Sequence, residues 1–281
     1  MKRIIKNLML IGIAATLCIA CDKGEDDDNG IAKGTFTVAQ GKKVYFSQGN
    51  LQYQASTNTW RFAERQCDVV GRDYENLSST YDGWIDLFGY GTSGWDSGAN
   101  AYQPYSKNHE ETDYFDGDLT GDNANADWGV YNKISNGGNK EGLWRTLTYR
   151  EWYYLLFTRP HYAELHSKGR VDGIQGLILL PDDWQIPNGV KFSPKEKNWD
   201  TNDYTIAEWR KMEANGAIFL PDSKYWSSST YQSYDNWNNS SFNRIYVYIV
   251  STSYTDDSYQ EAYNKSYRNA VCSVRLVQDV K

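Results

Sequence analysis

Apolar and polar residues alternate in short segments where the chain's regular patterning begins. Val44 and Phe46 alternate with Tyr45, which is the period-two pattern of a half-buried strand. Glycines and a Ser-Thr-Asn cluster separate these segments and supply the turns. The pattern predicts a β-meander with strands over residues 36–38, 43–46, 50–53 and 59–62.

Two helices are predicted to begin at capping boxes. Thr148 stands three residues before Glu151, and Thr205 stands three residues before Glu208. Such a pair satisfies two of the four backbone donors left open at a helix start. Gly216 occupies the position of a C-terminal cap for the second helix. The apolar residues that follow at helical spacing are Trp152, Leu155 and Leu156 in the first helix, and Trp209 and Met212 in the second.

A compact apolar run follows each predicted helix. Residues 177–180 are Leu-Ile-Leu-Leu before Pro181, and residues 218–220 are Ile-Phe-Leu before Pro221. Continuous apolar runs of this length predict central strands that are buried on both faces and end at proline. Two helices beside a sheet of short strands define an α+β fold.

Residues 71–127 show no clear periodicity and are rich in Gly, Asn, Asp and Ser. A long irregular stretch of this kind indicates a functional or well-packed loop region. One acidic segment spaces its oxygens like a calcium loop, although Asn123 stands where an apolar residue is usual. An acidic, solvated loop is the alternative. The candidate calcium ligands are Asp116, Asp118, Asp122 and Asp127.

The tail has a different composition. Strands are predicted over residues 245–250 and 271–277, but 28 of the 46 residues from 225 to 270 are Tyr, Ser, Asn or Asp. This is the chemistry of a binding surface, because Tyr supplies rigid contact area while Ser and Asn adapt their hydrogen bonds. A wet β-surface without a ligand is the alternative. The predicted ligand-binding residues are Trp226, Tyr231, Tyr234, Asn236, Trp237, Asn238, Tyr254, Asp256, Asp257, Tyr259 and Tyr263.

The N-terminus has the pattern of an export signal. A basic start precedes an apolar run over residues 8–20 that is too short to span a bilayer. The run ends at Cys21 in a segment that resembles a bacterial lipobox, with Cys18 where leucine is usual. We therefore expect residues 1–20 to be removed, Cys21 to be acylated, and residues 21–33 to form an acidic tether. The acidic tract behind Cys21 resembles the surface-export signal of Bacteroidetes lipoproteins, which implies an outer-membrane protein that faces outside the cell.

The charge of the mature chain excludes one class of partner. Removing Lys2, Arg3 and Lys6 from the 29 basic residues leaves 26 against 36 acidic ones, a net charge of −10. Nucleic acids and anionic membrane surfaces bind proteins through positively charged patches, so neither is expected as a partner of this acidic chain.

Two cysteines remain after processing, Cys67 and Cys272. In an oxidising compartment they could form a disulfide, and two buried thiols are the alternative. They do not suggest zinc, because no Cys-x-x-Cys pair is present and the three histidines are scattered.

Five motifs occur in order along the chain: Trp144 to Thr148 with Glu151 and Trp152, residues 179–181, residues 216–221, Tyr225 to Ser228, and Ser273 to Val277. This ordered set resembles the Fibrobacter succinogenes major paralogous domain and its Bacteroides lipoprotein relatives. The match covers roughly residues 128–281, and residues 43–51 resemble the opening of the Bacteroides relatives. The resemblance implies one C-type lectin-like domain over residues 34–281, with its core at 128–281 and a β extension at 34–127. In that fold the first and last strands pair and long loops gather on one face.

This fold's enzymatic branch contains the formylglycine-generating enzymes, whose two close cysteines bind copper. The wide sequence separation of Cys67 from Cys272 argues against that chemistry here. Sugar-binding C-type lectins hold calcium through two short segments, and residues 186–188 and 237–239 each lack one of the carboxylates required. The composition of residues 231–269 also resembles the variable region of proteins diversified by retroelements.

The predicted function is therefore non-catalytic binding of an extracellular glycan or protein by a lipid-anchored surface domain. No catalytic residue and no cofactor other than calcium is predicted. The alternatives are an oxygenase related to the formylglycine-generating enzymes and a fimbrial or other structural surface subunit.

Overall fold

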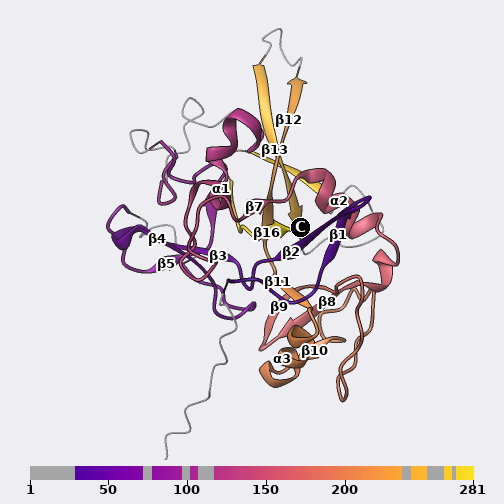
Figure 1. Cartoon of the computed structure of the whole chain (residues 1–281). Coiled ribbons are helices and arrows are strands. Elements are labelled where there is room, and N and C mark those ends of the chain that lie inside the picture. The colour runs from indigo at the N-terminus through magenta and orange to yellow at the C-terminus, as the bar shows by residue number, and fades with distance from the viewer. Residues whose placement is uncertain are drawn as a thin grey trace, which may run out of the picture.

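The computed structural model describes residues 29–71, 78–96, 102–106, 117–235, 242–251, 263–267 and 270–281, with the backbone alone at 231–235, 242–251 and 263–267. The architecture is α+β, as predicted, with short helices beside several small sheets (Figure 1). The helices are α1 (Trp128–Tyr131), α2 (Tyr149–Phe157) and α3 (Ile206–Ala214), with 3-10 turns η1 (Ala55–Thr57), η5 (Gly121–Ala126) and η6 (Tyr162–Glu164). No helix in these described ranges is long and apolar enough to cross a bilayer.

The four strands predicted at the start of the described chain are present, but the predicted β-meander is wrong, because they form two separate hairpins in different sheets. These strands are β1 (Phe36–Ala39), β2 (Lys42–Phe46), β3 (Leu51–Gln54) and β4 (Thr59–Phe62). The later strands are β5 (Trp84–Ile85), β6 (Phe88–Gly89), β7 (Arg145–Thr146), β8 (His166–Val171), β9 (Ile174–Leu179), β10 (Asp203–Tyr204), β11 (Ile218–Pro221), β12 (Lys224–Asp235), β13 (Phe242–Ser251), β14 (Tyr263–Tyr267), β15 (Val271–Cys272) and β16 (Leu276–Asp279).

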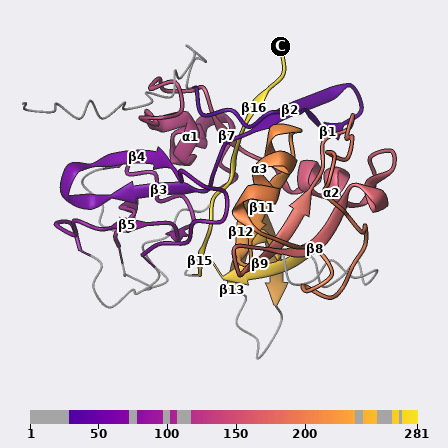
Figure 2. The same cartoon turned by 90° about the horizontal axis from the view of Figure 1, so that it is seen from below.

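One sheet joins the beginning of the domain to its end. Its strand order is β1-β2-β16-β7, and β16 pairs antiparallel with β2 so that Val277 lies opposite Phe46. Seen from below, β16 runs between β2 and β7 to the C-terminus (Figure 2). The last strand therefore pairs with the second strand, β2, whereas the family resemblance implies pairing with the first; β1 lies beyond β2 at the sheet edge.

Helix α2 packs against this sheet through the apolar face predicted for it. Trp152, Leu155 and Leu156 are buried in one core cluster with Phe36 and Phe46. The rings of Phe46 and Trp152 lie with centroids 5.9 Å apart. A fully buried aromatic side chain removes the largest area of apolar surface from water, so this contact fixes the helix on the sheet.

A second sheet, in the order β10-β8-β9-β11, lies between the two long helices. Alternate residues of β11 enter different cores: Ile218 and Leu220 join the α2 cluster, whereas Phe219 packs against Trp209 of α3. Successive strand residues point to opposite faces, so burial of both faces explains the continuous apolar runs. The prediction that both runs form central strands is right for β9 and wrong for β11, which lies at the sheet edge yet is buried by the helices.

A third core is built mainly from aromatic side chains and takes residues from both halves of the domain. Trp60 and Phe88, from the first half, lie in one buried cluster with Trp128, Trp144 and Trp226. Leu51 and Leu276 belong to the same cluster. The N-terminal β extension and the C-terminal core therefore share a single interior.

The tail forms a three-stranded antiparallel sheet in the order β12-β13-β14. The strands β12 and β13 extend well beyond the rest of the described fold (Figure 1). The predicted strand over residues 245–250 lies within β13, and the one over 271–277 is divided between β15 and β16.

Candidate ligand-binding surface

Both predicted capping boxes are present, and the first one places a polar network beside the tail sheet. The Thr148 hydroxyl accepts from the backbone N–H of Glu151 at 3.2 Å, while Glu151 Oε2 accepts from the backbone N–H of Thr148 at 2.8 Å. The equivalent reciprocal pair joins Thr205 to Glu208. Capping residues contribute ~1 kcal/mol each to helix stability.

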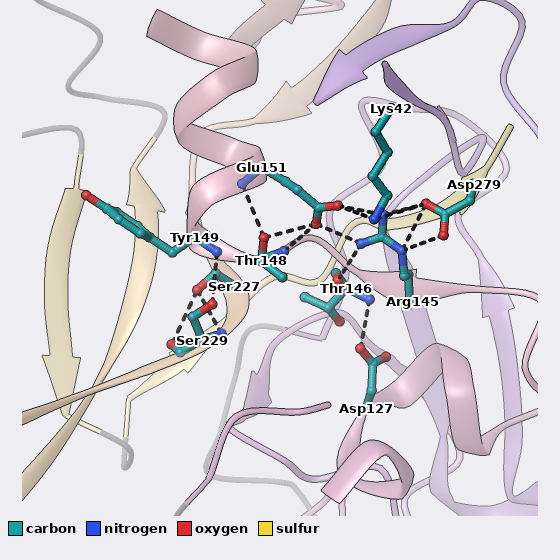
Figure 3. Close-up of polar contacts among 10 residues, drawn as sticks. All are labelled: Lys42, Asp127, Arg145, Thr146, Thr148, Tyr149, Glu151, Ser227, Ser229 and Asp279. Carbon is teal, nitrogen blue, oxygen red and sulfur yellow. Dashed lines mark hydrogen bonds and ion pairs between the residues drawn. The ribbon is translucent and has the colours of Figure 1, made fainter. Parts of the chain in front are cut away.

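Glu151 also belongs to an ion-pair cluster that we call the strand-helix junction, defined as Lys42, Arg145, Glu151 and Asp279 (Figure 3). The Arg145 guanidinium binds both carboxylate oxygens of Glu151 at 2.8 Å, and Lys42 Nζ lies 2.8 Å from Glu151 Oε1. Arg145 Nε also donates to Asp279 Oδ1 at 3.2 Å. The junction thus ties β2, β7 and β16 to the first turn of α2.

The network stabilises the charged form of Glu151. Burial alone would raise the pKa of this carboxyl, but hydrogen bonds and charge from Arg145, with Lys42 and the Thr148 amide, lower it to about 2. Bidentate guanidinium–carboxylate contacts are the stronger kind of ion pair. The carboxylate is therefore ionised across the physiological pH range.

Asp127 performs a second structural task on the other side of β7. Its carboxylate accepts from the backbone N–H of Gly129 at 2.9 Å, as the N-cap of α1, and from the backbone N–H of Thr146 at 2.8 Å. Burial raises the pKa of Asp127, and these donors oppose that effect, leaving the pKa at about 6. Asp127 therefore connects α1 to β7.

The predicted calcium loop is wrong where the structure describes it. Both oxygens of Asp127 accept backbone hydrogen bonds, and Asp118 Oδ1 accepts from the backbone N–H and the hydroxyl of Thr230 at 2.6 and 2.7 Å. Asp122 is exposed in η5, and Asp116 lies outside the described residues. The described residues contain no group of three or more His, Cys, Asp or Glu placed to hold a metal ion.

Backbone and side-chain hydrogen bonds attach the base of β12 to the body of the domain. The pairing of β12 with β13 is irregular between Trp226 and Thr230. There the Ser228 N–H donates to the Leu147 carbonyl at 2.9 Å, and the Ser229 hydroxyl accepts from the backbone N–H of Tyr149 at 3.1 Å (Figure 3). With the Asp118–Thr230 bonds, these contacts hold β12 beside the start of α2.

Trp226 is a core residue, so its prediction as a ligand-stacking platform is wrong. Its side chain is 1% exposed, its indole N–H donates to the Phe88 carbonyl at 2.7 Å, and its ring packs against Tyr90 with centroids 5.4 Å apart. The large aromatic side chain that suggested a binding role fills the interior of the domain instead.

The strand register gathers tyrosine positions on one face of the tail sheet. Tyr231 lies directly opposite Tyr246, which lies directly opposite Tyr267. Directly opposed residues of antiparallel strands occupy the same face. Counting by twos along the strands adds Tyr248 and Tyr263 to this face. We call these five positions the tyrosine face.

The predicted ligand residues divide around this arrangement. Tyr231 and Tyr263 belong to the tyrosine face, whereas Tyr234 is three residues from Tyr231 and belongs to the other face. The register did not follow from the composition, and Tyr246, Tyr248 and Tyr267 were therefore missed. The predicted residues that lie outside the described part of the chain are Asn236, Trp237, Asn238, Tyr254, Asp256, Asp257 and Tyr259.

Helix α2 carries a further aromatic group beside the tail sheet. The ring centroids of Tyr149 and Tyr153 are 6.3 Å apart, and those of Tyr153 and Phe157 are 5.7 Å apart. With Tyr154, the two tyrosines line an open depression of about 320 Å³. Their four-residue spacing was a sequence signal for a second face of α2, alongside its buried face.

The register relates the tyrosine face to α2. Tyr225 lies opposite Val250, which lies opposite Tyr263, so Tyr225 is on the same side of the sheet as the tyrosine face. Its side chain is buried in the core cluster that holds Trp152 and Leu155. The tyrosine face therefore begins at the core that α2 covers.

The possible disulfide between Cys67 and Cys272 is absent, because both thiols are free and buried. They belong to different core clusters. Burial raises the pKa of each thiol above its usual value. A reactive cysteine needs accessible thiolate, so neither thiol has the properties of a redox nucleophile.

Comparison of the chain with protein-family models, with curated proteins and with solved structures gave no match. The assignment of the candidate surface therefore depends on the geometry of this chain alone.

The low pKa of Glu151 leads to a pH-dependent stability. Its folded-state pKa of about 2 lies below the ordinary value of 4.5, so the ionised junction stabilises the fold above pH 4.5. This contribution is lost as the pH falls from 4.5 to 2, and amounts to about 3 kcal/mol. We expect Glu151→Gln to lower the free energy of unfolding by about that amount at pH 7 and much less at pH 2.5, measured by urea denaturation.

The matched control is Glu208→Gln at the exposed capping box of α3, since glutamine can serve in both boxes. The raised pKa of Asp127 has the opposite pH dependence, but it is common to the wild type and both variants and cancels in the comparison. The ionic account would be contradicted if Glu151→Gln lowered the free energy of unfolding by the same amount at pH 7 and at pH 2.5.

Proposed function

We propose that this chain is a non-catalytic binding protein whose ligand, an extracellular protein or glycan, contacts the tail sheet. The observation that carries the proposal is the cross-strand row formed by Tyr231, Tyr246 and Tyr267. Three neighbouring strands at ~4.8 Å spacing give this row a breadth of about 10 Å. Tyrosine offers a large amphipathic contact area with only two side-chain torsions to fix.

The attachment of the sheet supports a binding role. The base of β12 is bonded to Leu147, Tyr149 and Asp118, next to the strand-helix junction. A surface held by a rigid base loses less conformational entropy when a ligand binds. The aromatic depression on α2 adjoins β12 and β13 and enlarges the contact area that a ligand could use.

We further propose that the domain has the C-type lectin-like fold and is displayed at the cell surface on a lipid anchor. The pairing of β2 with β16 supports the fold assignment. The basic start, apolar run and Cys21 support the anchor. The acidic tether would separate the domain from the outer membrane.

Binding should depend on the tyrosine face. In a triple variant with Tyr231→Ser, Tyr246→Ser and Tyr267→Ser, we expect binding to weaken by about tenfold or more, because aromatic anchors dominate such interfaces. Full-length wild-type protein is first screened against printed glycans and purified extracellular proteins. The dissociation constant of each ligand found is then measured for the wild type and for the triple variant.

Tyr234→Ser is the matched control, since it changes the same residue type on the other face of β12. Thermal unfolding shows whether each variant is folded. The proposal fails if the folded triple variant binds as tightly as the wild type.

The lipid anchor is tested by Cys21→Ser. Multiple acyl chains contribute ~0.8 kcal/mol per buried CH₂, so we expect the wild type to partition into the detergent phase of a cloud-point separation and the variant into the aqueous phase. Cys18→Ser is the control. Equal partitioning of Cys21→Ser and wild type would place the anchor elsewhere or exclude it.

A further inference from the structure

A pocket of about 360 Å³ lies away from the tail sheet, where the β3–β4 hairpin meets the end of α1. Tyr53 and Trp60 of the hairpin form part of its lining, together with Ser93, Gln103 and Asn132. This volume falls in the range of sites that hold small ligands. No predicted ligand residue lies in it.

Two aromatic rings form a rigid part of the lining. Tyr53 and Trp60 are each 4% exposed, and their ring centroids lie 4.4 Å apart. Trp60 in turn packs on Phe88 with centroids 5.5 Å apart. Since both rings are held by the core behind them, they need not reorganise to accept a ligand.

The polar lining consists of amides and hydroxyls. The Asn132 side-chain NH₂ donates to the Ser93 carbonyl at 3.0 Å and to the Trp128 carbonyl at 3.1 Å. These bonds fix the amide plane, whose carbonyl oxygen is an acceptor with two lone pairs. On the other side, Asn58 accepts from the Tyr53 hydroxyl at 3.1 Å, and its own NH₂ is a donor.

The described lining contains no Asp, Glu, Lys, Arg or His. Tyrosine is its only ionisable residue type, and burial, followed by the charge of Tyr105, raises the pKa of Tyr53 to about 12. The described part of the lining is therefore neutral at physiological pH. Burying a charged ligand without an opposite charge costs several kcal/mol, so phosphates, carboxylates and ammonium groups are poor occupants.

We propose that this pocket binds one neutral sugar ring. A sugar ring presents C–H faces that suit the negative face of an aromatic ring, and hydroxyls that both donate and accept. Tyr131 at the rim, with its side chain 38% exposed, supplies an accessible ring in addition to the buried Tyr53 and Trp60, and the amides and hydroxyls supply the polar contacts. This site is independent of the proposed function because it uses β3, β4 and α1 and no residue of the tail sheet.

The test measures sugar binding by full-length protein in a polyoxyethylene detergent, which itself carries no sugar. The probes are glucose, galactose, mannose and N-acetylglucosamine, with glucose 6-phosphate and glucuronate as charged counterparts, followed by saturation-transfer NMR and calorimetry. We expect at least one neutral sugar to bind and its charged counterparts to bind at least about tenfold more weakly.

Tyr131→Ala should weaken that binding by about fivefold or more, whereas Tyr131→Phe should retain it. Tyr162→Ala is the matched control, since Tyr162 is 37% exposed and lies outside the pocket. The triple variant of the tyrosine face should bind the sugar as the wild type does, which separates this site from the proposed function.

Three results would overturn the proposal: no neutral sugar binds, a charged counterpart binds as tightly, or folded Tyr131→Ala binds unchanged. Thermal unfolding confirms folding of the variants. Should Tyr131→Ala not fold, Tyr105→Ala at the same pocket replaces it, with the same expected loss.

Discussion

The bidentate pair of Arg145 and Glu151 is the contact on which the rest of the described structure depends. Arg145 lies on β7 and reaches Asp279 near the C-terminus, while Glu151 caps α2 and receives Lys42 from β2. Four elements, β2, β7, α2 and β16, meet at these charges, and only β7 and α2 are neighbours in the sequence. Because Glu151 serves both as a cap and as an ion-pair partner, the direction of α2 and the closure of the sheet are set together.

This arrangement also positions the tail sheet. The residues between Arg145 and Tyr149 bond outward to β12, through the Leu147 carbonyl and the Tyr149 N–H. Displacement of the α2 N-terminus would therefore move the base of β12. The junction is partly buried, and breaking one partner of such a pair leaves the other desolvated charge without compensation. The strand-helix junction therefore sets the position of α2 and β12 and also stabilises the fold.

The motifs that carry the family resemblance are mostly parts of the scaffold. The Trp144 indole donates to the Gly137 carbonyl, the Tyr225 hydroxyl donates to the Pro221 carbonyl, and the buried Arg275 guanidinium donates to Gln66 Oε1. Residues with these tasks indicate a way of folding and do not identify a ligand. The function must be argued from surfaces that the motifs hold in place.

Local signals were readable from the sequence, while non-local ones were not. The boxes at Thr148 and Thr205 predicted both long helices because a cap depends on residues three positions apart. The edge position of β11, the burial of Trp226 and the free state of Cys272 depend on which distant segments pack together. The tyrosine face needed the register of three strands, and the neutral pocket needed the meeting of β3, β4 and α1.

The central proposal is that the tyrosine face is accessible to a ligand, in contrast to Tyr53, Tyr90 and Tyr225, which are buried in the cores. The most direct measurement is nitration of native full-length protein, with the modified tyrosines mapped by mass spectrometry. The account predicts fast modification of Tyr231, Tyr246 and Tyr267, and slow modification of the buried Tyr53, Tyr90 and Tyr225 until the protein is unfolded. Equal protection of both groups in the native protein would contradict it.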